Sequence, residues 1–285
     1  MLDLDQVESQ FRASVKVRPK LERPDVSSVL VITDLDSDER DAFLARIRHF
    51  LKGLDDEQLV SWTVTGREDL TTVRAMLAKV EASKPDLIVA YRHLFEGDQD
   101  LPHSLGTYAD MLTQATSSPV LLLPPPQHSN FQRATENSDK VLVVANAIVG
   151  DHVLVNWGLR LVETGGELTL AHIEDDAVFK RYIDVIGKIS DLDTDVAREQ
   201  IEKKLLGEAD GYLAETCQRI TEAYPDVRPS KIVRRGHTVK EYEALVKDGE
   251  YDIVVFNTKD EGQLAMHGLA YSIAVELIDR PLLML

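Results

Sequence analysis

The chain has 285 residues, a net charge of −17 and 44% hydrophobic residues, so it can form one large domain or two of ordinary size. The chain is acidic overall, and this net negative charge argues against a nucleic-acid partner. A single cysteine, Cys217, excludes an intramolecular disulfide. No apolar run approaches the roughly 18 residues that a membrane span needs, so we expect no membrane association. The N-terminus lacks a basic region followed by an apolar one, and we therefore expect a cytoplasmic protein.

Residues 1–27 are mixed and charged, and we interpret them as an N-terminal extension. Residues 28–124 then alternate short apolar runs with amphipathic stretches. The apolar runs show no polar alternation, which is typical of strands buried on both faces of a parallel sheet. The predicted strands are 29–33, 59–64, 85–90 and 120–123, and the predicted helices are 36–51, 70–80 and one that begins at Gly106. Strands alternating with helices predict an open α/β sheet.

Residues 125–139 are mostly polar and begin within a run of three prolines at 124–126, which favours a linker between two domains. Residues 140–285 then restart the pattern, because Val141–Asn146 can be laid over Val29–Asp34. The predicted strands are 141–146, 168–173, 230–235, 252–256 and 282–285, and the predicted helices are 151–163, 196–224, 239–247 and one from Gly268; residues 174–195 are expected to be irregular or partly helical.

The spacing between matching features differs in one place. It is 32 positions from Asp34 to Gly66, but 90 from Asn146 to Gly236. The excess of 58 holds one more strand and a long helix. The first domain is therefore predicted to be the same design with one strand–helix unit missing, and we expect that unit to contain the second strand.

Both halves end in the same way, with a helix that opens on a glycine and a strand that opens on a proline. Proline follows glycine by thirteen positions in both copies, from Gly106 and from Gly268. The two final strands are short, uncharged and apolar, and as open edges they would invite aggregation. We therefore expect them to pair with each other within the chain, as a pseudo-dimer, and two chains to be able to form a homodimer.

This order of elements resembles the universal stress protein family in its tandem, two-domain form. The residues that carry the resemblance are the first strand ending in Asp34, the glycine elements at 66 and 236, the DLIV and DIVV strands, and the two glycine-to-proline endings. The resemblance covers residues 28–123 and 140–285. It implies two open parallel-sheet domains of the flavodoxin or adenine-nucleotide-hydrolase type.

The resemblance also implies a possible site for ATP or another adenine nucleotide. Some members of the family place an acidic residue after the first strand, and a loop of the form G-x₂-G-x₉-G-[S/T] leads into the last helix. Backbone N–H groups in such a loop approach phosphates, and the helix N-terminus favours an anion. The candidate binding residues are Asp34, Gly97, Gly106 and Thr107 in the first domain, and Asn146, Gly236 and Gly268 in the second.

Each copy departs from that pattern in a different place. In the first domain, Gly97 is one position out of register, and Glu96 adds a charge that should repel phosphate. In the second, Asn146 replaces the acid and Leu269 replaces the hydroxyl residue. The ATP motifs are therefore degenerate.

The sequence favours a cytoplasmic stress-response or regulatory binding module, acting through a protein partner, over an efficient catalyst. One alternative is a weak, ATPase-like nucleotide-binding enzyme, and another is a scaffold that binds a different small or apolar ligand. A metal site at His172, Glu174 and Asp176 is conceivable, but a framework histidine is the simpler interpretation. His237 and His267 are likewise interpreted as structural or surface residues.

Overall fold

The computed structural model describes residues 20–54, 59–96, 103–144, 152–188, 193–258, 266 and 268–285. The first half contains β1 (Ser28–Ile32), α2 (Ser37–Phe50), the short 3-10 helix η1 (Lys52–Leu54), β2 (Ser61–Thr65), α3 (Val73–Ser83), β3 (Leu87–Tyr91), α4 (Thr107–Ala115) and β4 (Val120–Leu123). A connector with α5 (Phe131–Ala134) follows. The second half contains β5 (Lys140–Val144), α6 (His152–Leu161), β6 (Glu167–Asp175), α7 (Asp176–Ile186), α8 (Thr194–Ala223), β7 (Arg228–Gly236), α9 (Thr238–Gly249), β8 (Ile253–Phe256), α10 (Gly268–Glu276) and β9 (Leu282–Met284).

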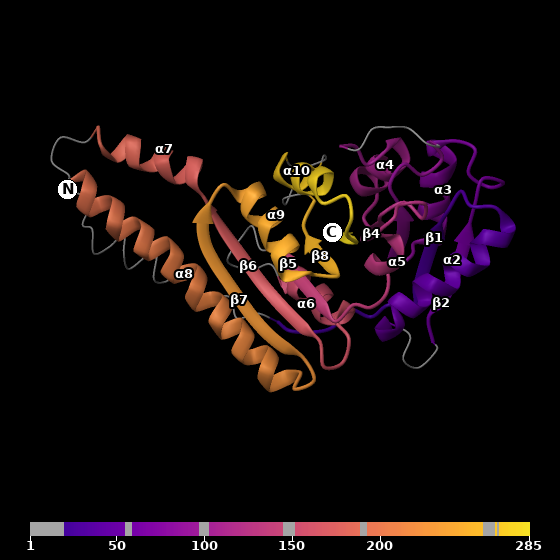
Figure 1. Cartoon of the computed structure of the whole chain (residues 1–285), viewed down its shortest axis with the longest axis horizontal. Coiled ribbons are helices and arrows are strands. Elements are labelled where there is room, and N and C mark those ends of the chain that lie inside the picture. The colour runs from indigo at the N-terminus through magenta and orange to yellow at the C-terminus, as the bar shows by residue number, and fades with distance from the viewer. Residues whose placement is uncertain are drawn as a thin grey trace.

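Within the described residues the strands form one sheet of nine, in the order β2-β1-β3-β4-β9-β8-β5-β6-β7 (Figure 1). All neighbouring pairs are parallel except β4 and β9. Strands β1, β3, β4, β5 and β8 are buried along nearly their whole length, as the unbroken apolar runs predicted. The predicted fold class, two open α/β units in tandem, is confirmed.

The two halves meet where β4 pairs with β9, with Leu121 opposite Leu283. The predicted pairing of the two final strands within one chain is thereby confirmed. Because this pair is antiparallel, the strands of the two halves run in opposite directions. The carboxyl edge of the first half therefore lies beside the amino edge of the second. Ligand sites at the carboxyl edges of the two halves would face opposite sides of the molecule.

The first half has four strands where the second has five, so the predicted loss of a strand–helix unit is confirmed for the described residues. Its place is different from the one expected. Strand β2 pairs with β1, as β6 pairs with β5, so it stands in the position of a second strand. The outermost position, filled by β7 in the second half, has no counterpart beyond β2 among those residues. Spacing measured along the chain could not reveal which position was empty.

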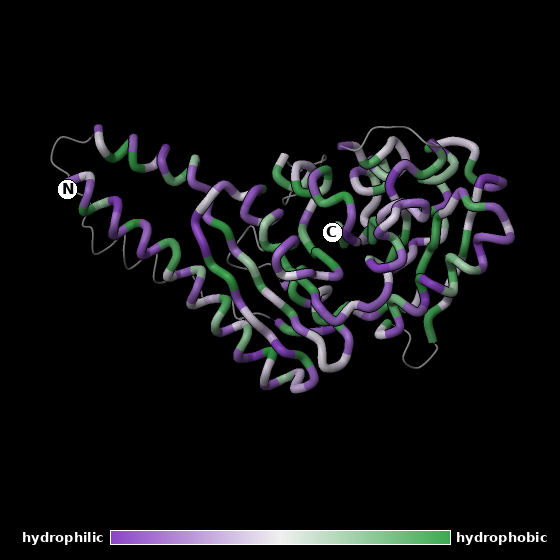
Figure 2. Tube along the Cα trace, viewed as in Figure 1, coloured by the Kyte–Doolittle hydropathy of each residue, from purple (hydrophilic) through white to green (hydrophobic). Residues whose placement is uncertain are grey.

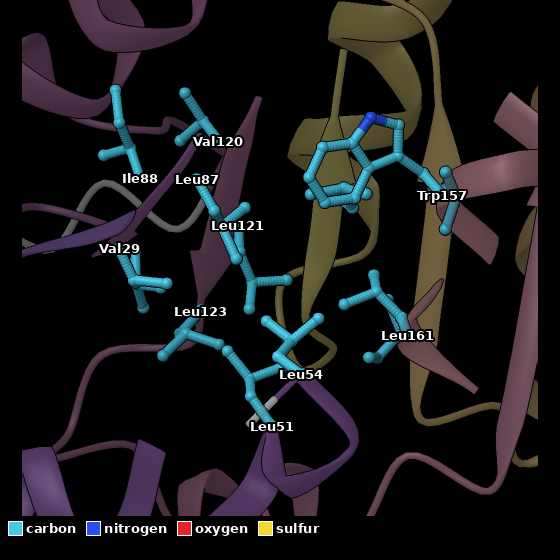
Figure 3. Close-up of a cluster of buried hydrophobic side chains, with 14 of the residues drawn as sticks. Val29, Leu51, Leu54, Leu87, Ile88, Val120, Leu121, Leu123, Trp157 and Leu161 are labelled. Atoms are coloured by element: carbon cyan, nitrogen blue, oxygen red, sulfur yellow. The ribbon is translucent and has the colours of Figure 1, made fainter. Parts of the chain in front are cut away.

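An apolar cluster fastens one face of the seam (Figure 3). Leu54 of η1 packs with Trp157 and Leu161 of α6, beneath Leu121 of β4. The guanidinium of Arg160 donates to the carbonyl oxygens of Gly53 at 3.0 Å and Leu54 at 2.7 Å. The cluster contains side chains from both halves, which therefore share a core on this face. Burial of such side chains stabilises the fold by about 25 cal/mol for each Å² removed from water.

The opposite face of the seam is fastened by Arg92, which follows β3. Its side chain is 2% exposed, and Nη2 donates to the carbonyl oxygens of Ala274 at 2.5 Å and Leu277 at 3.0 Å. These carbonyls belong to the end of α10, where a helix has unpaired acceptors and a partial negative charge. Burial lowers the pKa of Arg92 to about 10, while Asp279 opposes that shift.

Helices α7 and α8 project from the second half, and β6 and β7 extend toward them (Figure 1). The stretch 174–195 was expected to be irregular or partly helical, and it contains the regular helix α7. Asp175 and Asp193 begin α7 and α8, each accepting two backbone N–H bonds at 2.8–3.2 Å. Hydrophilic and hydrophobic residues alternate along α8, whose buried positions include Leu213 and Ile220 (Figure 2). None of the helices described is both long and apolar enough to cross a membrane.

Candidate functional site

A cleft of about 580 Å³ opens at the carboxyl edge of the first half, where β1 and β3 end side by side. The chain leaves β1 through α2 toward β2, and leaves β3 through α4 toward β4, so this is the point at which the strand order reverses. Open α/β sheets bind ligands at such a point. Polar residues of the lining include Asp34, Glu39, Arg67, His93, Gln127 and His128.

Asp34 lies at the centre of this edge, with its carboxylate held on three sides. Oδ2 accepts from Arg67 Nη2 and from the backbone N–H of Phe95, both at 3.0 Å. Oδ1 accepts a short hydrogen bond from the hydroxyl of Tyr91, which also accepts the Asp34 N–H at 2.8 Å. Asp34 therefore follows β1, where the sequence places an acidic residue, but its carboxylate already has protein partners.

Tyr91 connects the site to the core beneath it. Its ring packs edge-on against Phe43 of α2 at 5.6 Å between centroids, and its hydroxyl lies 3.0 Å from Thr33 Oγ1. Burial, and then the hydrogen bond to Asp34, raise the pKa of the Tyr91 hydroxyl. Tyr91 therefore remains a neutral donor and holds Asp34 in one orientation.

Residues 91–96 turn sharply between Asp34 and α4. His93 and Phe95 both have left-handed backbones, with φ of 57° and 65°. The Phe95 ring lies 4.7 Å from that of Tyr108 on α4, and the Arg67 guanidinium lies 5.7 Å from its centroid. These contacts hold the turn, which costs backbone energy in non-glycine residues, and direct the Phe95 N–H at Asp34.

Glu96 occupies the start of α4, where the resemblance placed a phosphate. Its Oε1 accepts the backbone N–H of Thr107 at 2.6 Å, and its Oε2 lies 3.7 Å from Nδ1 of His93. Gly106 has φ of 83°, and a Cβ there would lie 2.7 Å from Glu96 Oε2. Helix N-termini attract anions, and here the chain's own carboxylate takes that place.

The structure thus gathers Asp34, Gly106 and Thr107 around the loop of residues 91–96. Their role in binding a ligand stays a prediction. Gly97, Asn146 and His267 lie outside the described residues. Gly236 and Gly268 belong to the second half, whose carboxyl edge faces the other way. They are not among the residues described as lining the Asp34 cleft.

The corresponding edge of the second half is organised by hydrogen bonds within the protein. Asp175 Oδ1 caps α7, and its Oδ2 accepts the Thr238 hydroxyl at 2.8 Å. Burial opposes ionisation of Asp175, but these hydrogen bonds lower its pKa overall. His172 is buried, with Nε2 at 3.5 Å from Glu174 Oε2. Among the residues described, no group of three histidine, cysteine or acidic side chains could hold a metal ion.

Sequence reasoning missed three residues that define the first site. Tyr91 lies one residue beyond the strand predicted at 85–90, although its position directly after an apolar run could have marked it as the end of that strand. Arg67 and Arg92 stood out by no spacing or motif, because charged side chains after strands usually meet solvent. Their partners are 33 and more than 180 positions away, so only folding reveals them.

No protein-family model matches the sequence, and no curated protein matches it either. Among solved structures, a putative universal stress protein from Pseudomonas aeruginosa is 13% identical, with 91% of this chain and 93% of that chain covered and a TM-score of 0.51. A functionally unknown protein from the same species is 12% identical, with 91% and 92% covered and a TM-score of 0.50. A universal stress protein from Archaeoglobus fulgidus is 14% identical, with 90% and 95% covered and a TM-score of 0.47.

The chain has the tandem universal stress protein fold. The likeness to the first of these structures extends over both halves. At this level of identity it concerns the fold alone, so function has to be argued from the site.

Proposed function

We propose that the chain is a regulatory binding module of the universal stress type, which binds a small polar molecule in the Asp34 cleft and does not turn over ATP. The observation that carries this proposal is the Glu96 carboxylate on the Thr107 N–H. A nucleotide phosphate at the same place would have to displace Glu96 or lie against its negative charge. Either event weakens binding, because the phosphate and the Glu96 carboxylate are both negatively charged and repel each other.

The rest of the cleft supports a small polar ligand. Its volume of about 580 Å³ lies within the range of ordinary ligand pockets. His128 and Gln127, from the connector, and Glu39, from α2, add polar side chains to its lining. As part of the same proposal, the protein acts in the cytoplasm, in a stress response, through a protein partner, and two chains associate as a homodimer.

The alternative is binding of ATP or another adenine nucleotide, and Asp34 at the end of β1 is the observation that favours it. The test begins by denaturing the purified protein and identifying released small molecules by mass spectrometry. ATP with magnesium is then titrated calorimetrically into the wild type and into Glu96→Ala.

We expect no stoichiometric nucleotide in the released fraction and no micromolar ATP affinity in the wild type. A matched control is Thr107→Val, which keeps the backbone N–H that binds Glu96. Co-purified ATP, or micromolar binding that Asp34→Ala abolishes, would overturn the proposal in favour of the nucleotide. A non-nucleotide compound that is released from the wild type but not from Asp34→Ala would support the proposed binding of a small polar molecule.

A further inference from the structure

The second half contains two helices that the described part of the first half does not match. Helices α7 and α8 lie between β6 and β7, whereas β2 in the first half is followed by α3 and β3. α7 and residues 194–208 of α8 project away from the sheet, and we call these two segments the arm (Figure 1). Each chain therefore carries one arm within the residues described.

The arm is anchored at its base and lightly supported beyond it. The guanidinium of Arg235, on β7, lies 2.8 Å from the carboxylates of both Asp176 and Glu202, and 4.5 Å from the centre of the Phe179 ring. Every buried residue of α8 lies at or beyond Ala209, so the part of α8 in the arm has none. Because helices in proteins gain most of their stability by packing an apolar face, the arm has surface left to cover.

Helix α7 has two neighbouring apolar stripes, and only one of them is covered. Phe179 and Ile183 form the buried stripe. Val178, Tyr182 and Val185 form the other, at positions i, i+4 and i+7, which share one face of a helix. Val178 is half-buried, but Tyr182 is 51% exposed and Val185 is 58% exposed. The second stripe therefore faces water.

Exposed apolar side chains are concentrated in the arm. Among the described residues six large apolar side chains are exposed, and three of them, Tyr182, Val185 and Val196, belong to the arm. Val185 lies at the end of α7 and Val196 at the start of α8, so both are toward the tip. A group of exposed apolar residues rimmed by charges is typical of a protein interaction site.

The charges of the arm are divided between its two helices. Residues 180–188 contain three cations and one anion, and residues 193–202 contain four anions and one cation. Arg181, Lys188 and Glu199 are exposed and form no ion pair with other described residues. The basic segment of one arm is thus complementary to the acidic segment of a second, identical arm. A two-fold axis between two arms would satisfy this match twice.

The final strands of the two halves are not available to a second copy. β4 pairs with β3 and β9, and β9 pairs with β4 and β8, so both strands lie inside the sheet. The arm, in contrast, stands clear of the sheet (Figure 1). With one arm in each chain, arm-to-arm contact closes at two copies, because each arm is covered by the other.

We propose that the arm is a dimerisation element, which packs against the arm of a second copy of this chain as a four-helix bundle. The exposed stripe of α7 fills the space between the two arms, and Arg181 and Lys188 of each copy face the Glu199 side of the other. Burial of the stripe drives association, and the opposite charges fix its orientation. The proposal specifies the surface of the homodimer proposed above and does not depend on a ligand in the Asp34 cleft.

The first test is the oligomeric state of the full chain without added ligand, measured by sedimentation equilibrium over a dilution series. We expect a wild-type dimer that dissociates on dilution. Val185→Glu places two charges in the interface, one from each copy, and should weaken the dimer on the order of a hundredfold. The matched control is Val153→Glu, because Val153 lies on α6, outside the arm, and is 57% exposed. It should leave the dissociation constant unchanged.

The outcomes separate the arm from the rest of the proposed function. A dimer that Val185→Glu weakens no more than Val153→Glu does would overturn the arm interface and leave the proposed homodimer standing. A monomeric wild type would overturn both. Tyr182→Ser, which adds no charge and should also weaken the dimer, provides a second variant if Val185→Glu has a lowered urea midpoint. Ligand binding in the cleft is tested separately, by the released compound and the ATP titration.

Charge reversal tests whether the occupant is a second arm. One variant carries Arg181→Glu and Lys188→Glu, which makes both segments of its arm acidic. The other carries Asp195→Lys and Glu199→Lys, which makes both segments basic. Each variant alone should be a monomer, and an equimolar mixture should form the dimer, because every acidic segment then faces a basic one. A mixture that associates no more than the separate variants, or variants that dimerise alone as the wild type does, would overturn the proposal.

Discussion

The two halves of the sheet carry an aspartate at the same place, and the two side chains behave in opposite ways. Asp86 is surrounded by serine hydroxyls and backbone N–H groups; burial opposes its ionisation, but these hydrogen bonds lower its pKa overall. Asp252 faces Asp139, and burial together with that neighbour raises its pKa to about 7. A repeat therefore preserves the position of a residue without preserving its chemistry, because neighbours set the energy of its charged form.

The comparison extends to Arg92, which follows β3, and Thr258, which lies beyond the end of β8. Arg92 and Thr258 are equivalent, since their backbone N–H groups donate to the carbonyls of Leu123 and Leu285 at 3.1 and 2.8 Å. Arg92 reaches across the seam to α10, whereas the Thr258 hydroxyl donates to the Leu285 carbonyl of its own half at 2.6 Å. The first half thus supplies the fastening residue on this face.

The largest expected effect on stability comes from removing the Arg92 side chain. Arg92→Ala leaves the carbonyls of Ala274 and Leu277 without their buried donor and opens a cavity. We expect a loss of about 3 kcal/mol in the free energy of unfolding, measured by urea titration. Thr258→Val, at the equivalent place, should cost about 1 kcal/mol. Similar losses from the two variants would show that Arg92 has no special part in the seam.

Asp86→Ala tests the aspartate comparison directly. Removing four hydrogen bonds to a partly buried carboxylate should cost about 2 kcal/mol at pH 7. Because the folded pKa of Asp86 is lowered, its contribution is present above the unfolded value of 3.8 and is lost as the pH falls below it. The difference between variant and wild type should therefore shrink in urea titrations at pH 3. A difference that is independent of pH would contradict this account.

The stability contribution of Asp252 should have the opposite sign of pH dependence. Its folded pKa is raised, so its contribution is present below the unfolded value of 3.8 and is lost as the pH rises to about 7. Asp252→Asn should therefore be more stable than the wild type at pH 8, by on the order of 1 kcal/mol. Urea midpoints at pH 5 and pH 8 measure this. A variant that is less stable than the wild type at pH 8 would contradict it.

The smallest effect concerns the start of α4. Glu96→Ala removes the acceptor for the Thr107 N–H and a negative charge at the helix N-terminus, and should cost about 0.5–1 kcal/mol. Glu96→Gln keeps an acceptor oxygen and should lose less. Thermal unfolding of the two variants provides the measurement. If Glu96→Ala is as stable as the wild type, the bond to Thr107 contributes nothing to the folded state.

Much of the architecture could be predicted from local pattern. The apolar runs at 29–33, 85–90 and 141–146 predict buried parallel strands because both faces of each strand are covered. The equal glycine-to-proline spacing predicts that the two final units are alike, and their apolar strands predict pairing. The candidate site could be predicted only as far as Asp34, Gly106 and Thr107 falling near one another.

The position of the empty strand, the partners of Asp34 and the role of Glu96 could not be predicted in the same way. β2 takes the position next to β1 by pairing, which spacing along the chain does not record. Glu96 was predicted to repel phosphate, but its bond to Thr107 depends on the turn at His93 and Phe95. Such contacts arise from backbone geometry that a list of residue types does not contain.

The sequence by itself determined the strand–helix alternation, the duplication and the strand that each half offers for pairing, because hydrophobic periodicity is a local property. Tertiary structure alone decided that the halves join antiparallel, so that their carboxyl edges face opposite ways. It also decided that Arg92 closes α10 and that Asp252 meets Asp139. The physical reason is that hydrogen bonding and ionisation depend on which distant groups surround a side chain and exclude water from it.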